Sequence, residues 1–185
     1  TATWGVLEEG YKEGYGANAA GLKTEEEIVK ALLYGYSMIG FDCSDKIDLG
    51  IEKLSDEAVD KRFEQLNETF RAAVHASYLN AEFKVGTSKI TFTENQLHRI
   101  VLEYGEAIMH IQFIYNSYLK NTPWDIDFEL DLSKPGKVLT PQEHYLIGNE
   151  LQRNGIKLSS ICLDPLKDSE AVNDNLQLHC EIADT

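Results

Sequence analysis

The sequence predicts an α/β domain built as part of a (β/α)8 barrel, with about four parallel strands and one small β-hairpin insertion. Two observations predict this fold class. Short apolar stretches alternate with longer segments whose apolar residues recur every three or four positions, which is the pattern of strands followed by helices. The chain has 185 residues, 43% of them hydrophobic and 26% charged, which suits a single globular domain over residues 1–185.

The strands of this barrel segment are expected near residues 16–20, 36–42, 126–132 and 156–163. Each is a short run of the kind that a buried parallel sheet uses. Because barrel chemistry sits on the loops that follow the strands, the places to inspect are residues 18–23, 42–48 and 133–138 and the segment after Leu163.

The helices between these strands carry start signals of their own. Thr24 with Glu27, and Thr140 with Glu143, have the spacing of a capping box, in which side chains satisfy free amides of the first turn. Pro141 suits the first helical turn that follows Thr140. We therefore expect one helix to begin after each of these threonines.

Two further helices and a hairpin are expected in the middle of the chain. Apolar spacing predicts one helix over residues 59–74 and a longer one over residues 93–118, whose tyrosines we expect to pack in the core. Between them, residues 82–92 alternate around Gly86 and predict a small hairpin. Asn67 begins a glycosylation sequon, which we interpret as a chance match inside a helical pattern.

Composition narrows the classes of partner and compartment. The net charge of −14 disfavours binding to nucleic acid or to anionic membranes, since both carry negative charge. No apolar run is long enough to span a membrane, and the start of the chain does not resemble a signal peptide. The three well-separated cysteines indicate a reducing, cytoplasmic compartment. The first residues suggest a chain taken from a longer protein.

Several stretches resemble the tagaturonate epimerase family of hexuronate catabolism. They occur in family order and span nearly the whole chain: Ala2-Thr3-Trp4-Gly5-Val6, Glu9-Gly10-Tyr11, Glu13-Gly14-Tyr15-Gly16-Ala17, Phe41-Asp42-Cys43-Ser44-Asp45, Thr140-Pro141 with His144, Glu150-Leu151 with Gly155, and His179 with Glu181-Ile182-Ala183. The resemblance covers the central part of the family's longer chains. It implies a metal-dependent epimerase that moves protons at a carbon beside a carbonyl, with an acid, a base and a divalent cation.

The positions that the resemblance assigns to this chemistry are replaced. Where the family has an A-D-A-D-H loop, this chain has Asn18, Ala20 and Gly21 in place of the two acids and the histidine. Lys134 stands where the family has an acid, and Asp164 stands where it has an arginine that suits a carboxylate. We therefore expect no metal site and no cofactor, with a divalent metal ion required only if the chain is active.

The remaining polar residues offer weak catalytic candidates, namely Asp42, Asp45 and His144. Asp42 and Asp45 follow an expected strand, but a turn or helix cap explains them better. His144 and His179 lie in expected helices, where a structural role is favoured over a catalytic one. Cys43 has no partner base that the sequence reveals.

Two functions remain open at this point. The first is a non-catalytic or degenerate family member, a pseudoenzyme acting as a subunit or binding module. The second is a metal-dependent sugar-acid epimerase whose site another chain completes, with Asp42, Asp45 and His144 contributing. Because half a barrel exposes two sheet edges, we expect a homo-oligomer or a partner chain that supplies the missing strands. The resemblance leaves a sugar acid open as a ligand, and the sequence itself names none.

Overall fold

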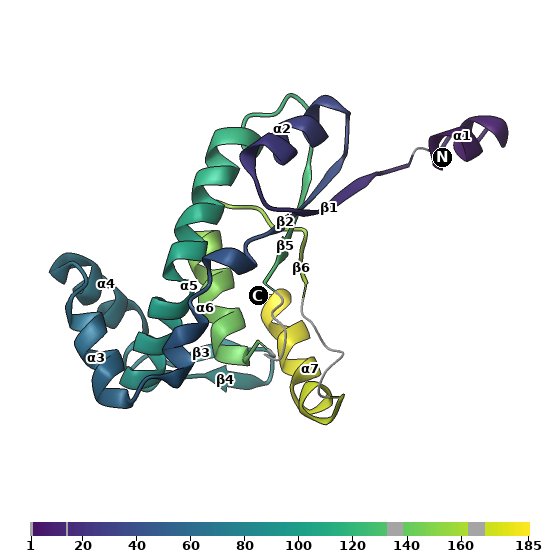
Figure 1. The fold of residues 1–185 in the computed structure, drawn as a ribbon. Helices are drawn as coiled ribbons and strands as arrows, with labels where there is room; N and C mark the ends of the chain where they lie inside the picture. Colours follow the sequence, from purple (N-terminus) through teal and green to yellow (C-terminus); the bar gives the residue numbers. More distant parts are fainter. Residues whose placement is uncertain (1, 14, 133–138, 163–168) are drawn as a thin grey trace.

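The structure is a computed structural model, and it describes residues 2–13, 15–132, 139–162 and 169–185. Within these residues a four-stranded parallel sheet has the strand order β1-β2-β5-β6 (Figure 1). Its strands are β1 (Asn18–Leu22), β2 (Met38–Asp42), β5 (Asp127–Asp131) and β6 (Ser160–Cys162). This sheet, its helices and one antiparallel hairpin form the partial barrel that the sequence predicts.

The first strand begins later than the sequence suggests. We expected a strand over residues 16–20 followed by a loop over residues 18–23, but Asn18–Leu22 is the strand itself. It pairs with β2 through Asn18 opposite Met38, and an irregularity in the pairing lies between Ala19 and Leu22. Gly, Ala and Asn dominate this stretch, so no alternation of large apolar side chains marks its boundaries.

The helices that follow the strands begin where the capping signals predict. Helix α2 is Glu25–Leu33 and helix α6 is Pro141–Arg153, and both have complete capping boxes from Thr24 and Thr140. Helix α7 is Ser169–Ala183 and helix α1 is Ala2–Glu8, which stands away from the sheet (Figure 1).

A long insertion lies between β2 and β5. It contains the short turns η1 (Ser44–Lys46) and η2 (Leu49–Lys53), helices α3 (Asp56–Glu64) and α4 (Glu68–Tyr78), the hairpin β3 (Phe83–Val85) and β4 (Ser88–Ile90), helix α5 (Glu94–Ile114) and the π-helical turn η3 (Tyr115–Leu119). The hairpin is confirmed. The single helix expected over residues 59–74 is two helices, because the side chain of Asn67 caps a new helix at the amide of Phe70.

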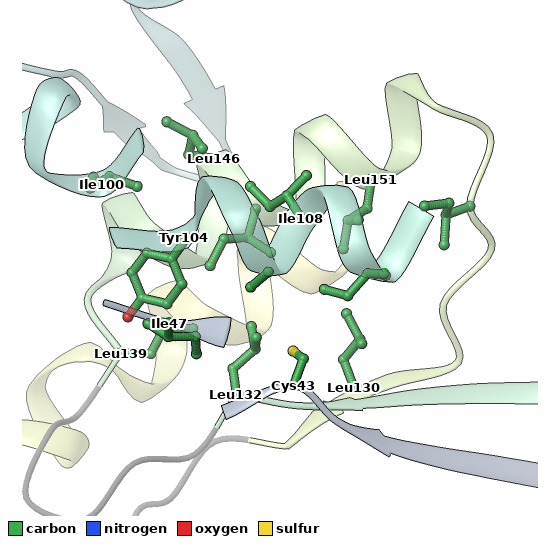
Figure 2. Close-up of a cluster of buried hydrophobic side chains, with 14 of the residues drawn as sticks. Cys43, Ile47, Ile100, Tyr104, Ile108, Leu130, Leu132, Leu139, Leu146 and Leu151 are labelled. Carbon is green, nitrogen blue, oxygen red and sulfur yellow. The ribbon is translucent and has the colours of Figure 1, made fainter. Parts of the chain in front are cut away.

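The core fills the space between one face of the sheet and the helices. Ile39, Phe41, Phe128 and Leu130 alternate along β2 and β5, are at most 1% exposed, and belong to one cluster with residues of α5 and α6. Figure 2 shows Leu130 beneath the helix that carries Ile108. Tyr104 is buried in this core as expected, and Tyr115 and Tyr118 pack against it. Within the described residues, the helices therefore cover one face of the sheet and leave the other without a helix.

Candidate functional site

The face of the sheet opposite the core, called the open face below, carries Asn18, Ala20, Gly40, Asp42, Glu129 and Ser160, because successive strand residues alternate between the two faces. In a (β/α)8 barrel the helices lie outside, so the uncovered face of the sheet is the barrel interior. The open face is thus the part of this chain in which barrel chemistry is sought.

Glu129 lies at the centre of the open face. Its Oε2 accepts a hydrogen bond of 2.7 Å from the Ser160 hydroxyl on β6, and its Oε1 accepts one of 3.4 Å from the Asn18 amide on β1. The bond from Asn18 crosses β2 at Gly40. A Cβ at Gly40 would lie 3.0 Å from the Ala20 Cα and 3.3 Å from Glu129 Oε1. Gly40 is therefore the gap that lets side chains of β1 and β5 meet above β2.

Asp42 and Asp45 meet at the carboxyl end of the sheet, as their place after β2 predicts. The Nζ of Lys23 lies 3.3 Å from Asp42 Oδ2 and 3.1 Å from Asp45 Oδ1. The Asp42 carboxylate also accepts a 2.9 Å bond from the backbone N–H of Ser44, which makes the turn that the sequence favours for these residues. The ammonium group of Lys23 therefore forms ion pairs with both carboxylates.

The charge of Asp42 is fixed by these partners. Burial raises the pKa of its carboxyl, but hydrogen bonds from Ser44 and the attraction of Lys23 outweigh burial and hold that pKa below its usual value. The pKa of Lys23 is raised in turn, chiefly by its hydrogen bond to Asp45. A carboxylate held ionised in this way is poorly suited to exchange protons at neutral pH.

Sequence reasoning singled out the two acids and missed Lys23. Its signal was available, since Lys23 directly follows β1 and the carboxyl ends of neighbouring parallel strands meet at one edge of a sheet. Lys134 and Asp164 lie outside the described residues.

His144 lies apart from this cluster, in a buried pair with His179. Their Nδ1 atoms are 2.9 Å apart, between α6 and α7, and each residue is 5% exposed. Burial, followed by the neighbouring His179, lowers the pKa of His144 to about 4. Burial also lowers the pKa of His179. Both rings are therefore neutral at pH 7.

A cavity of about 560 Å³ adjoins this histidine pair at the β6 edge of the sheet. Tyr145 and Asn149 of α6, Ser160 of β6 and Cys180 of α7 contribute to its lining. Cys43 lies elsewhere: it is 1% exposed in the core, with its Sγ 3.7 Å from the carbonyl oxygen of Asp131. This burial denies Cys43 the access that a nucleophile needs.

A group of metal-ligand type lies among the inserted helices. His75 on α4 and Glu94 and His98 on α5 bring their ligand atoms within 4.8 Å of one another. The sequence predicts no metal site, because the histidines have no recognised ligand spacing. Glu94 and His98 share one face of α5, and His75 joins them only through the fold.

Comparison with known proteins gives concordant results. The model of the UxaE family, tagaturonate epimerase, matches residues 1–184 of this chain. The tagaturonate/fructuronate epimerase of Thermotoga maritima is 31% identical over 192 residues, which cover 98% of this chain and 39% of that protein. Crystal structures of the fructuronate-tagaturonate epimerase UxaE from Cohnella laeviribosi, native and with glycerol, match with a TM-score of 0.94 and 33% identity over 99% of this chain and 39% of theirs.

The chain therefore spans about two fifths of the length of the relatives it matches. Within the part of the chain that the structure describes, no helix is long and apolar enough to cross a membrane.

Proposed function

This chain belongs to the tagaturonate epimerase family, and from that premise we propose that it is a non-catalytic part of an epimerase-type barrel, acting as a subunit or binding module. Epimerisation beside a carbonyl needs a base, an acid and a cation to stabilise the enediolate. The proposal therefore depends on whether the open face supplies these three kinds of group.

The open face does not fit a divalent cation at the position that the family resemblance indicates. Asn18 and Ala20 stand on β1 where the resemblance places acids, and an amide or a methyl group gives no carboxylate ligand. Glu129 already accepts bonds from Asn18 and Ser160, and the Lys23 ammonium lies 3.3 Å from Asp42. That ammonium would repel a second cation bound at Asp42.

The backbone conformation of Gly21 is the strongest support for a non-catalytic role. The resemblance assigns a histidine to this position, and Gly21 has a φ of +72°, in the left-handed region. The backbone conformation of a histidine at this position would be strained by roughly 1–2 kcal/mol, so this conformation favours glycine. The loss of the histidine and the local backbone conformation support each other.

The test is an epimerase assay of this chain with tagaturonate and fructuronate, with and without added Mn²⁺, Zn²⁺ or Ni²⁺. We expect no interconversion above the buffer rate, while the Thermotoga maritima relative serves as the positive control in the same assay. Interconversion by this chain alone would overturn the proposal.

A second function has one observation in its favour. Asp42, Glu129 and Asp131 place carboxylates on adjacent strands of one sheet face, where barrel strands from another chain could complete a sugar-acid site. His144 lies between α6 and α7, apart from these carboxylates, and its contribution to the composite site stays a prediction. Interconversion that appears only with a partner chain and disappears in the Glu129→Gln variant would establish this second function.

A further inference from the structure

The cluster of His75, Glu94 and His98 lies on helices and shares no strand with the open face. His75 comes from α4, and Glu94 and His98 come from the first two turns of α5, four residues apart and so on one helix face. In Figure 1 the helices α3 and α4 flank one end of α5, and α2 lies near its other end. We propose that these three residues form a binding site for a divalent transition metal ion of the zinc type.

His98 is already oriented as metal-bound histidines are. Its Nδ1 lies 2.7 Å from the Oδ1 of Asp60 on α3, and the same Oδ1 accepts a 3.3 Å bond from the amide of Asn95. A proton on Nδ1 donated to Asp60 leaves the lone pair of Nε2 free for a ligand bond. A carboxylate that fixes the far nitrogen of a histidine in this way is the usual outer partner of a zinc ligand.

The free nitrogen of His98 points at its neighbour. Its Nε2 lies 2.8 Å from the Nε2 of His75. Without an ion, one of these two nitrogens must therefore carry a proton and donate a hydrogen bond to the other. When a metal binds, the His75 proton moves to its own Nδ1 and both Nε2 lone pairs face the ion. Tetrahedral zinc with bonds of about 2.0 Å separates two ligand nitrogens by about 3.3 Å, so a small outward shift accommodates the ion.

The aromatic ring of Phe63 holds both imidazoles in position. It stacks on His98 with a centroid separation of 3.8 Å and on His75 with one of 5.3 Å, at angles of 14° and 11°. His98 is 5% exposed, so its ring cannot turn away into solvent. Ligands held by packing lose little freedom when the ion arrives, which favours binding.

The donor set indicates the kind of ion. Two imidazole nitrogens and one carboxylate oxygen suit Zn²⁺, Co²⁺ or Ni²⁺, whereas Mg²⁺ and Ca²⁺ prefer oxygen ligands alone. Glu94 is exposed, so water reaches the ion from its side and fills the fourth position of a tetrahedral site. The ion would join α4 to α5 and stabilise the inserted helices.

The test is calorimetric titration of the chelator-treated chain with Zn²⁺, together with the absorption spectrum of the Co²⁺ form. We expect one ion per chain, a tetrahedral Co²⁺ spectrum, and binding weakened at least tenfold in His75→Gln and in Asp60→Asn. His110→Gln is the matched control, because His110 also lies on α5 but packs against Phe41 and Phe113. We expect that variant to bind as the parent does.

Two results would overturn the proposal: no Zn²⁺ binding by the parent chain, or binding that His75→Gln leaves unchanged. His75 is half-buried, so its substitution is less harmful to folding than that of buried His98. If His75→Gln is unfolded by circular dichroism, exposed Glu94 provides the second variant: Glu94→Gln should weaken Zn²⁺ binding and change the Co²⁺ spectrum, and unchanged values would contradict the site. Neither outcome depends on epimerase activity.

Discussion

At the scale of single residues, the buried pair of His144 and His179 sets how this chain responds to acid. Each ring is 5% exposed, and their Nδ1 atoms are 2.9 Å apart. A proton on both facing nitrogens would place two donors and two positive charges against each other. The pair is therefore stable only while at least one ring is neutral.

The first prediction concerns pH. The pKa of His144 is about 4 in the folded chain, against an unfolded value of 6.5. The unfolded state therefore takes up the proton first, and the stability is fully present above pH 6.5 and lost as the pH falls toward 4. We expect the free energy of unfolding by urea to fall by about 2 kcal/mol between pH 7 and pH 4.5 from this residue alone.

The control for this prediction is the His144→Gln variant, which removes the titrating group. Its free energy of unfolding should change less over the same pH window. Asp42 does not interfere, because its pKa is lowered from an ordinary value of 3.8 and its contribution is lost only below this window. An acid dependence that is equally steep in His144→Gln would contradict the assignment.

At the scale of the elements, a helix start or a residue cluster can be predicted from the sequence only when neighbouring residues specify it. The boxes at Thr24 and Thr140 are contained within four residues, and both helices begin where these boxes predict. Asn67 also caps a helix, but the apolar spacing continues through the break and conceals it. The contact between His75 and His98 has no local sequence signal, since it forms only when α3, α4 and α5 pack together.

The second prediction tests one of these caps. Thr140 accepts a 3.3 Å bond from the N–H of Glu143, and its own N–H donates a 2.7 Å bond to the Glu143 carboxylate. Thr140→Ala removes the side-chain half of this box and should lower the free energy of unfolding by about 1 kcal/mol. Thr140→Ser keeps the hydroxyl and should lie close to the parent in the same urea titration. Equal losses in both variants would show that the hydroxyl of Thr140 is not the source of the stability.

At the scale of the whole molecule, the sheet formed by the described residues ends in two edge strands, β1 and β6. Edge strands present unpaired backbone groups, and a parallel barrel closes only when further strands cover them. The cavity beside β6 and the exposed Trp4 and Leu7 of α1 add apolar surface to these edges. The open face itself carries no helix on the described part of the chain.

The third prediction is that this chain associates, with itself or with a chain that supplies strands. Sedimentation velocity at micromolar concentration in 0.15 M salt should show species larger than a monomer. Association should weaken at low salt, since each copy carries a net charge of −14 that salt screens. A compact monomer under both conditions would contradict the prediction.

The Ala20→Lys variant locates the associating surface. A lysine on the edge strand β1 should hinder strand pairing and reduce association. Leu33→Lys is the matched control, because Leu33 is 79% exposed on α2 and adds the same charge away from the sheet. Equal effects of both substitutions would assign the change to charge alone.

The pairing of β2 with β5 also dictates an order of events during folding. Met38 lies opposite Asp127, with the two inserted helices, the hairpin and α5 between them in the chain. Closing so long a loop costs conformational entropy before the pairing of β2 with β5 can offset it. The hairpin and the helices, in contrast, form from local contacts. During synthesis the insertion can therefore fold while the centre of the sheet waits for β5 to leave the ribosome. Until then β2 has only β1 beside it, which is the interval in which this chain is most exposed to misassembly.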